Sequence, residues 1–318
     1  MSSSANETLA LFTYLTLRVN AVLAPPIFVL GVIGNAINIW IFTRKSLQKN
    51  PCSIYFCSAS IVSLLALCSG LMSRLLGGYS ADLTTWNNVL CKLRFYSYYL
   101  GIVLLSWFLV FASLDRFLST SQFVNYRKLS CTRIAYQLVS CSTVFSILIY
   151  LQVFYCFIAD PNQYPVQCYA YGDICRTFND LQFLIIYSLL PAILMGIFGC
   201  LTIRNIQQME RRIDSTTNIP NYRQKRIQLV PMLLVQIAFF LIFTIPLAVT
   251  KFYNTLIVLL HLPLTPQRQA FETFVFNITV LVSYLNCSIS FYVYTLAGNL
   301  FRQELKKTAQ QIVAKIRC

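Results

Sequence analysis

Charged residues are scarce in this chain: Asp, Glu, Lys and Arg make up 11% of its 318 residues, against about a quarter in soluble domains. Histidine occurs once, at His261, with no obvious catalytic partner, so nothing supports a soluble enzyme. Repeats, linkers and low-complexity blocks are also missing, and nothing suggests a second domain. We therefore expect no enzymatic activity, no bound metal and no cofactor.

Hydrophobic residues are abundant instead, at 57% of the chain with a mean hydropathy of +0.63. Crossing about 30 Å of hydrocarbon takes roughly 20 apolar residues. The predicted spans are residues 20–43, 53–76, 90–120, 133–158, 181–205, 227–252 and 271–297. Only helices and closed barrels satisfy their backbone groups in hydrocarbon, and these runs are too long and uniform for barrel strands. The sequence predicts an all-α membrane protein, a bundle of seven transmembrane helices.

Basic residues are divided unequally between the two sets of connections. Eighteen of the 25 lysines and arginines fall with one set, together with only four of the ten acids. Because positive flanks stay cytoplasmic, the amino terminus is expected outside and the carboxyl terminus inside. The net charge of +15 therefore does not indicate nucleic-acid binding, since anionic lipid of the inner leaflet is a sufficient partner for the basic side. The sequon at Asn6 lies on the predicted outer side, which predicts glycosylation there.

The expected organisation has three parts: an extracellular segment over residues 1–19, a seven-helix domain over 20–298, and a surface helix with a short tail over 299–318. In the last part apolar residues recur at helical spacing with basic residues elsewhere, so this amphipathic helix should lie along the inner membrane surface. Five prolines within or near the start of spans predict either hinges or simple bends. They are Pro25, Pro26, Pro191, Pro231 and Pro246.

Most of the twelve cysteines fall inside spans or on the reducing side. Cys91, Cys168 and Cys175 lie clearly outside, and three thiols permit one bridge with one left over. We expect Cys91 to pair with Cys168, with Cys175 as the competing partner. Cys156, near the outer end of the fourth span, could take up the spare thiol.

Polar residues of the seventh span share one helical face. They are spaced by four, three and four residues, namely Thr279, Ser283, Asn286 and Ser290. Polar groups in hydrocarbon turn inward and seek partners on other helices. The natural candidates are Asn35, Ser63 and Tyr294. This interior network either holds helices together or rearranges between states.

The order of these features resembles the rhodopsin-like (class A) G protein-coupled receptors over about residues 18 to 317. The most specific part is the spacing, with Trp86 five residues before Cys91 and Cys91 25 residues before Arg116. The other matching positions are Gly34-Asn35, Asp115-Arg116-Phe117, Pro191, Phe240 with Pro246, and Phe301-Arg302.

The resemblance implies a plasma-membrane receptor that binds an extracellular ligand and activates a heterotrimeric G protein. Asp115, Arg116 and Phe117 would then form the switch: Arg116 holds Asp115 in the closed bundle and meets the cytoplasmic partner once the sixth helix moves outward. A stop-transfer flank is the alternative, but it does not explain an acid before the arginine. The interior network would link the ligand side to Arg116. The hinge residues would be Pro191, Phe240, Thr244 and Pro246.

Several family positions depart from the usual pattern. Ser63 stands where a sodium-binding aspartate is usual, Thr244 where a tryptophan is expected, and "SFYVY" where Asn-Pro-x-x-Tyr is expected. Tyr98 occupies the position of the amine-binding aspartate, and the seventh span has no lysine. Sodium modulation and the ordinary tryptophan toggle are therefore in doubt, a monoamine ligand is not expected, and retinal attachment is excluded.

The candidate ligand pocket is lined by Arg94, Tyr98, Lys251 and Glu272. Three loop acids before the fifth helix, Asp160, Asp173 and Asp180, could steer a basic peptide, while the bases could hold a carboxylate or be simply solvated. The amino-acid sequence as a whole looks most like those of invertebrate FMRFamide-type neuropeptide receptors, so we expect a peptide ligand. A chemosensory receptor for small molecules is the alternative. A transporter or channel is less supported, because the spans lack midplane charge and the halves do not resemble each other.

Overall fold

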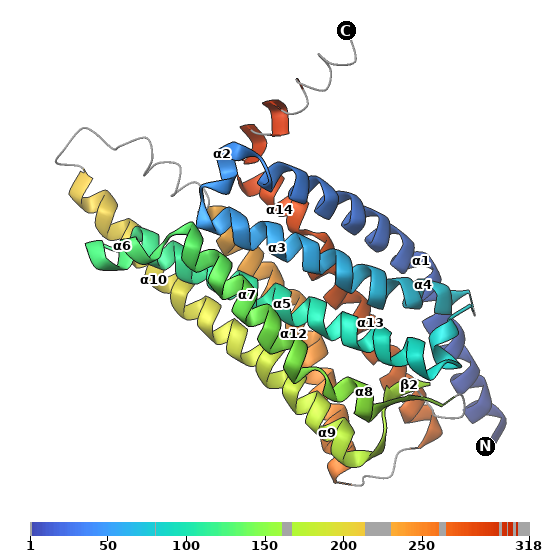
Figure 1. Cartoon of the computed structure of the whole chain (residues 1–318). Coiled ribbons are helices and arrows are strands. Elements are labelled where there is room, and N and C mark those ends of the chain that lie inside the picture. Colours follow the sequence, from blue (N-terminus) through green and yellow to red (C-terminus); the bar gives the residue numbers. More distant parts are fainter. Residues whose placement is uncertain are drawn as a thin grey trace.

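The computed structural model describes residues 2–79, 81–160, 167–213, 230–260, 265–298, 301–303, 305–307 and 310. Within these residues seven helical segments are long and apolar enough to cross a membrane, and they lie side by side as one bundle (Figure 1). Their bounds are Glu7–Phe42, Pro51–Gly78, Asn88–Thr120, Thr132–Cys156, Gly172–Gln208, Leu233–Ile257 and Pro266–Ser288. The predicted seven-helix bundle is confirmed.

The helices and strands follow one another in the order of the predicted spans. The first four spans and their connections comprise α1 (Ser2–Phe42), α2 (Lys45–Gln48), α3 (Pro51–Ala66), the π-helix η1 (Leu67–Leu71), α4 (Met72–Gly78), η2 (Leu83–Thr85), α5 (Asn88–Thr120), α6 (Val124–Leu129), α7 (Thr132–Ile149) and α8 (Gln152–Cys156). The remainder comprises β1 (Phe157–Ala159), β2 (Cys168–Ala170), α9 (Gly172–Gln182), the π-helix η3 (Phe183–Leu189), α10 (Leu190–Ile213), α12 (Val230–Leu259), α13 (Pro266–Ser288) and α14 (Ser290–Ala297).

The third transmembrane helix, α5, occupies the centre of the bundle. In its most apolar window 72% of the residues are buried, against 17% for the fourth span, and α5 packs against α3, α7 and α10. Asn87 begins it by accepting hydrogen bonds from the backbone N–H groups of Val89 and Leu90. A central third helix places its inner end, where Asp115 and Arg116 lie, among the other helices.

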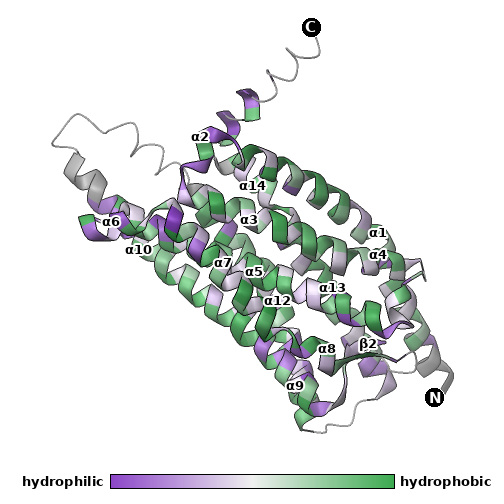
Figure 2. Ribbon diagram, in the orientation of Figure 1, coloured by the Kyte–Doolittle hydropathy of each residue, from purple (hydrophilic) through white to green (hydrophobic). Residues whose placement is uncertain are grey.

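Large apolar side chains cover the outside of the bundle. On the fifth transmembrane helix Ile185, Leu189, Ile193 and Ile197 recur every four residues and are all exposed. Figure 2 shows hydrophobic residues along the middle of the helices and hydrophilic ones concentrated near their ends. Continuous apolar surface of this extent is not stable in water, so it is the surface that faces lipid.

Two predicted boundaries are wrong. The first helix begins at Ser2 instead of residue 20, so residues 2–19 are helical and Asn6 lies within α1. The fifth transmembrane helix begins at Gly172 instead of residue 181, which places Asp173 and Asp180 in helix α9 and not in a loop. The extension of the fifth helix, residues 172–182, is largely polar, and a hydropathy criterion does not detect such a segment.

A short antiparallel hairpin covers the outer end of the bundle and was not predicted. In it β1 pairs with β2, with Phe157 opposite Ala170 and Ala159 opposite Cys168. Gly172, at a φ of 71°, turns the chain from β2 into α9, a conformation that favours glycine. The hairpin therefore joins the fourth span to the fifth across the outer face.

The fifth transmembrane helix contains a π-helical segment immediately before Pro191. There the backbone N–H of Leu190 bonds to the carbonyl of Ile185, five residues back. In the same register the carbonyl of Ile186 would accept from residue 191, but proline has no N–H. The indole N–H of Trp107, on α5, donates to the Ile186 carbonyl at 3.2 Å instead. This bond ties the third helix to the fifth at the proline.

The other span prolines do not interrupt their helices. Pro25 and Pro26 lie inside α1 and Pro246 lies inside α12. The seventh helix breaks at Ile289, between α13 and α14, with no proline at that point. His261 and much of the predicted surface helix lie outside the described residues.

Candidate functional site

Arg116 lies at the inner end of α5 and is completely buried. Its Nη2 donates to Asp115 Oδ2 at 2.5 Å and to Asn50 Oδ1 at 2.9 Å. The side chain of Asp115 is 5% exposed, so both members of this ion pair are removed from water. A buried guanidinium without a partner costs several kcal/mol, and the carboxylate and the amide together offset that cost.

Two further residues hold the ion pair in place. Ser130, which follows α6, donates its hydroxyl to Asp115 Oδ1 at 2.6 Å. Asn50 caps α3, where its side-chain oxygen also accepts from the backbone N–H of Cys52 at 3.1 Å. Sequence reasoning found Asp115 and Arg116 but missed these two partners. Asn followed by Pro is a helix-start signal that predicts the cap, but it does not reveal the bond to Arg116.

Phe117 points away from the ion pair. Its ring stacks on Phe198 of α10 with the centroids 6.1 Å apart, and it also lies 6.5 Å from the ring of Tyr126. Phe117 therefore packs α5 against the fifth helix and against α6. Within the predicted triplet only Asp115 and Arg116 form the charged centre.

Near the inner half of the bundle the seventh helix is bonded to the first. The side-chain nitrogen of Asn35 donates to the carbonyl of Cys287 at 2.7 Å, and Ser290 donates to Asn35 Oδ1 at 3.3 Å. Asn38, which the sequence did not single out, donates to Ser290 Oγ at 3.1 Å. This part of the predicted polar network is a joint between two helices.

The other seventh-helix residues bond elsewhere. Asn286 donates to Thr244 Oγ1 of α12 at 2.9 Å, close to Pro246, and at 3.5 Å to the carbonyl of Phe240. The hydroxyls of Thr279 and Thr250 lie 3.2 Å apart. Ser283 donates to the carbonyl of Val280 on its own helix. Three of the predicted residues therefore connect the seventh helix to the first or the sixth, and one does not leave its helix.

Ser63 and Tyr294 lie apart from these bonds. Ser63 Oγ is buried with no hydrogen-bond partner among the described residues. The ring of Tyr294 packs 4.8 Å from Phe56, 5.6 Å from Phe42 and 6.0 Å from Phe301. Across the described part of the chain these hydrogen bonds and ring contacts thus form separate groups, and none of them links Thr279 to Arg116.

Two disulfides fix the outer end of the bundle. Cys91, at the start of α5, is bonded to Cys168 of β2, and Cys156 is bonded to Cys175 of α9. The competing Cys91–Cys175 bridge is not formed. The hairpin is thereby tethered to the third, fourth and fifth helices.

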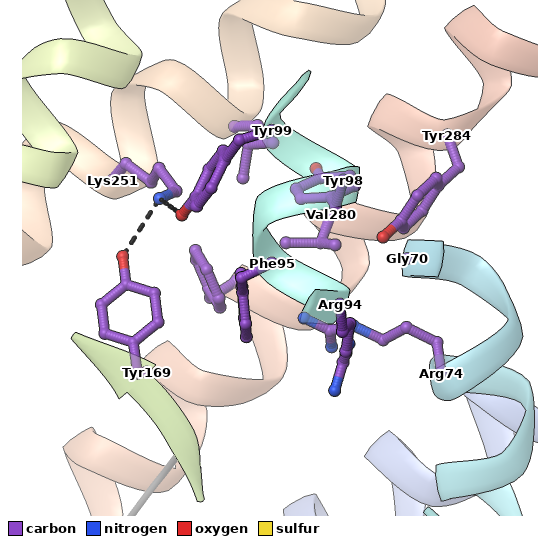
Figure 3. Close-up of a pocket in the computed structure, with 12 residues that line it drawn as sticks. Gly70, Arg74, Arg94, Phe95, Tyr98, Tyr99, Tyr169, Lys251, Val280 and Tyr284 are labelled. Atoms are coloured by element: carbon purple, nitrogen blue, oxygen red, sulfur yellow. Dashed lines mark hydrogen bonds between the residues drawn. The ribbon is translucent and has the colours of Figure 1, made fainter. Parts of the chain in front are cut away.

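Beneath the hairpin lies a pocket with an empty volume of about 470 Å³ (Figure 3). Its lining residues are Gly70, Arg74, Arg94, Phe95, Tyr98, Tyr99, Tyr169, Leu247, Lys251, Phe276, Val280 and Tyr284. Of the predicted pocket residues, Arg94, Tyr98 and Lys251 meet here. Glu272 does not: it accepts from Arg268 at 2.8 Å and from Tyr253 at 2.7 Å beside a neighbouring groove.

Lys251 forms a buried ion pair with Asp180. The two atoms Nζ and Oδ1 are 3.0 Å apart, and the side chains are 6% and 3% exposed. Tyr169 donates to the same carboxylate oxygen at 2.5 Å, and Thr255 donates to the other at 3.2 Å. Lys251 also reaches Tyr169 and Tyr99, as the dashed lines of Figure 3 show. Asp180 is therefore not a free loop acid that steers a ligand; it neutralises a pocket lysine.

Tyr169 stays neutral in this cluster. Burial, reinforced by the negative charge of Asp180, raises the pKa of its phenol well above the ordinary value. A neutral phenol can donate to the carboxylate while it accepts from Lys251. The hydrogen bonds of this cluster thus join β2, α9 and α12.

Two arginines lie at the other side of the pocket. Arg94 donates to Asp82 at 3.2 Å and to Thr84 at 2.7 Å. Arg74, which the sequence did not single out, donates to the neutral side chain of Asn277. In Figure 3 the side chains of Arg74 and Arg94 point toward one another. The pocket therefore has three cationic side chains along its wall and no acid in its lining.

A seven-helix bundle with a buried Asp-Arg pair at one end and a disulfide-covered pocket at the other can be compared with known proteins. The profile of the 7 transmembrane receptor (rhodopsin family) matches residues 34–294. The chain belongs to the rhodopsin family of seven-transmembrane receptors. The receptor is consequently not an enzyme, and it is a multi-pass plasma-membrane protein with an extracellular ligand and a G protein partner.

Similar receptors differ in their named ligands. The receptor is 23% identical to C-C chemokine receptor type 1 of Macaca fascicularis, over 92% of its own chain and 81% of the other. It is 24% identical to C-C chemokine receptor type 8 of Homo sapiens, over 91% and 78%. The uracil nucleotide/cysteinyl leukotriene receptor of Homo sapiens is 26% identical over 32% of this chain and 28% of that receptor.

Proposed function

We propose that this receptor binds a peptide of the neuropeptide class in the pocket beneath the hairpin and, in response, activates a heterotrimeric G protein through Arg116. The amino terminus lies outside and the carboxyl terminus inside. A small-molecule ligand of a chemosensory receptor is the second candidate.

The buried Asp115–Arg116 pair is the observation that carries the coupling. It lies at the end of the central helix remote from the disulfides, held by Asn50 of α3 and Ser130 after α6. A charge that is fully buried and held by residues from other elements can be released by their movement. Once released, Arg116 is available to a cytoplasmic partner. The stop-transfer alternative requires a charge at this position, but it does not require burial.

Two features support the proposed orientation. Disulfides form and persist in oxidising compartments, and both bridges lie at the end of the bundle opposite Arg116. Eighteen of the 25 lysines and arginines fall with the connections on the Arg116 side. Glycosylation of Asn6 would follow from the same orientation, and loss of the attached glycan in Asn6→Gln would test it on surface-expressed receptor.

A peptide ligand is supported by the relatives that align with the whole receptor, since they are named for chemokines. The small-molecule candidate is favoured by a different observation: the hairpin lies over the pocket, and its residue Tyr169 forms part of the lining. The named nucleotide and leukotriene ligands belong to a relative that aligns with a third of the chain.

The test is nucleotide exchange on G proteins in membranes from cells that express the receptor, screened in parallel against a peptide library and a metabolite library. The proposal expects a peptide to accelerate exchange. Arg116→Ala should abolish the response at normal surface levels, whereas Arg127→Ala, on the nearby α6, should retain it. A metabolite response would favour the second candidate. Ligand-evoked current or uptake without G protein activation would contradict both.

A further inference from the structure

Among its described lining residues the pocket has three cations, of which two are in ion pairs. Lys251 is paired with Asp180 and Arg94 with Asp82. Arg74 forms no ion pair with any described residue, and all six outer-side acids of the chain are among the described residues. Its hydrogen-bond partner, Asn277, is a neutral amide, which fixes the position of a guanidinium without balancing its charge.

The unbalanced arginine faces a second arginine. Arg74 of α4 and Arg94 of α5 both line the pocket, and their side chains point toward one another in Figure 3. The side chain of Arg94 is only 14% exposed, so the repulsion between the two cations is poorly screened by water. An oxyanion between the two guanidinium groups would remove this repulsion and accept charge-assisted hydrogen bonds from both.

The surrounding residues shape the space next to these arginines. Tyr98 and Tyr284 line the same part of the pocket, and Gly70 leaves room for them. A Cβ on Gly70 would collide with the phenol oxygen of Tyr284 and lie 2.6 Å from the ring of Tyr98. The two phenol rings, whose centroids lie 5.5 Å apart, line the pocket together with the arginines, and Val280 supplies an apolar wall.

We propose that Arg74 and Arg94 form the subsite for an oxyanion of the ligand, a carboxylate or a phosphate group, and that Arg74 is the residue that determines this specificity. Lys251 is not the primary anchor, because Asp180 already neutralises it. The assignment of this subsite rests on the proposed function only in placing the ligand pocket at the outer end of the bundle. It limits a peptide ligand to one that carries an acidic side chain or a free carboxyl terminus into the pocket.

The test uses purified full-length receptor in phosphatidylcholine nanodiscs and needs neither the natural ligand nor a G protein. Thermal unfolding is measured with sodium phosphate, with glutarate and with its neutral diamide glutaramide, all at the ionic strength of a chloride reference. We expect phosphate or glutarate to raise the Tm and glutaramide to leave it unchanged. The oxyanion that raises the Tm at the lower concentration shows whether the subsite prefers a phosphate or a carboxylate group.

Variants assign the effect to Arg74. In Arg74→Gln the concentration of oxyanion needed for the same Tm shift should rise at least about tenfold, and Arg74→Lys should be intermediate because it keeps the charge without the planar fork. Arg18→Gln is the matched control, because Arg18 is an exposed outer arginine whose hydrogen-bond partner, Tyr14, is also neutral; its response should equal that of the wild type.

Absence of any oxyanion-specific Tm shift in the wild type would overturn the proposal, and so would an equal shift in Arg74→Gln. The comparison of glutarate with glutaramide on the wild type decides the question even if Arg74→Gln does not fold. Failure of G protein activation would refute the proposed function but leave this result standing, so the two can fail independently.

Discussion

Asn50 Oδ1 accepts two hydrogen bonds, one from Arg116 Nη2 at 2.9 Å and one from the backbone N–H of Cys52 at 3.1 Å. A single amide oxygen therefore begins the second transmembrane helix and holds the arginine at the inner end of the third. Any movement that separates α3 from α5 at this point breaks the bond to Arg116. Under the proposed function, Asn50 helps to keep the receptor closed.

Replacing Asn50 should change basal signalling in a predictable direction. Asn50→Ala removes a hydrogen bond to a charged group, worth about 1.5–3 kcal/mol, so the closed state loses stability relative to the open one. We expect basal nucleotide exchange to rise by roughly tenfold. Asn50→Asp keeps the cap and adds a negative charge beside Arg116, so basal exchange should fall below that of the wild type.

Asn87→Ala is the control for the loss of a helix cap. Asn87 begins α5 at the outer end, accepts from two backbone N–H groups and does not contact Arg116. It should cost stability of about 1 kcal/mol without raising basal exchange. Equal basal exchange in Asn50→Ala, Asn87→Ala and the wild type would show that Asn50 only caps its helix.

The buried Lys251–Asp180 pair should dominate the stability of the outer end. Asp180→Asn or Lys251→Met leaves one buried charge without its partner and should cost about 3–5 kcal/mol of unfolding free energy. The double variant should recover part of this loss. Arg268→Met breaks an ion pair in which the arginine side chain is 55% exposed, so water screens the pair and its loss should cost far less than the loss of the buried pair. Equal destabilisation at the two sites, measured by thermal unfolding, would contradict the burial argument.

Tyr169 gives this cluster a defined pH dependence. Because the pKa of its phenol is raised in the folded receptor, the folded state keeps the proton after the unfolded phenol, with a pKa of about 10, has lost it. The stability that Tyr169 adds over Tyr169→Phe should be constant from about pH 6 to 9 and decline above about pH 10. A difference that already changes between pH 6 and 9 would show that Tyr169 titrates in the native cluster.

The bond from Trp107 to Ile186 can be tested with a double-mutant cycle. Trp107→Phe should destabilise the receptor by about 1–3 kcal/mol, because it leaves a partly buried carbonyl without a donor. Pro191→Ala restores a backbone N–H in the next turn, so Trp107→Phe should cost less in that background. If the two substitutions destabilise the receptor additively, the contribution of the Trp107 bond does not depend on the missing N–H of Pro191.

The sequence predicts best where a long periodic signal exists. The seven spans follow from runs of apolar residues, and hydrophobic length alone determines them. The Asp115–Arg116 pair was recognisable because a charge pair at the end of an apolar helix needs a partner. Helix α9 was missed because residues 172–182 are largely polar, although they continue the fifth helix without a break.

Partners that are distant in sequence were not predictable. Asn50 lies 66 residues from Arg116, and Asp180 lies 71 residues from Lys251, so neither bond leaves a local pattern. Arg74 appears in the sequence as an ordinary helix-end cation, and its unbalanced charge emerges only when the ion pairs of its neighbours are known. The polar face of the seventh helix was found together with one of its partners, Asn35, which accepts from Ser290. The other partners were not: Asn286 bonds to Thr244, and Ser63 bonds to none of the described residues.

The central claim is that release of Arg116 activates a G protein. It is tested most directly by nucleotide exchange in membranes containing Asn50→Ala alone and combined with Arg116→Ala, at matched surface expression and without any ligand. We expect Asn50→Ala to exceed the wild type and the double variant to fall to the level of membranes without receptor. Full retention of the elevated exchange in the double variant would contradict the account.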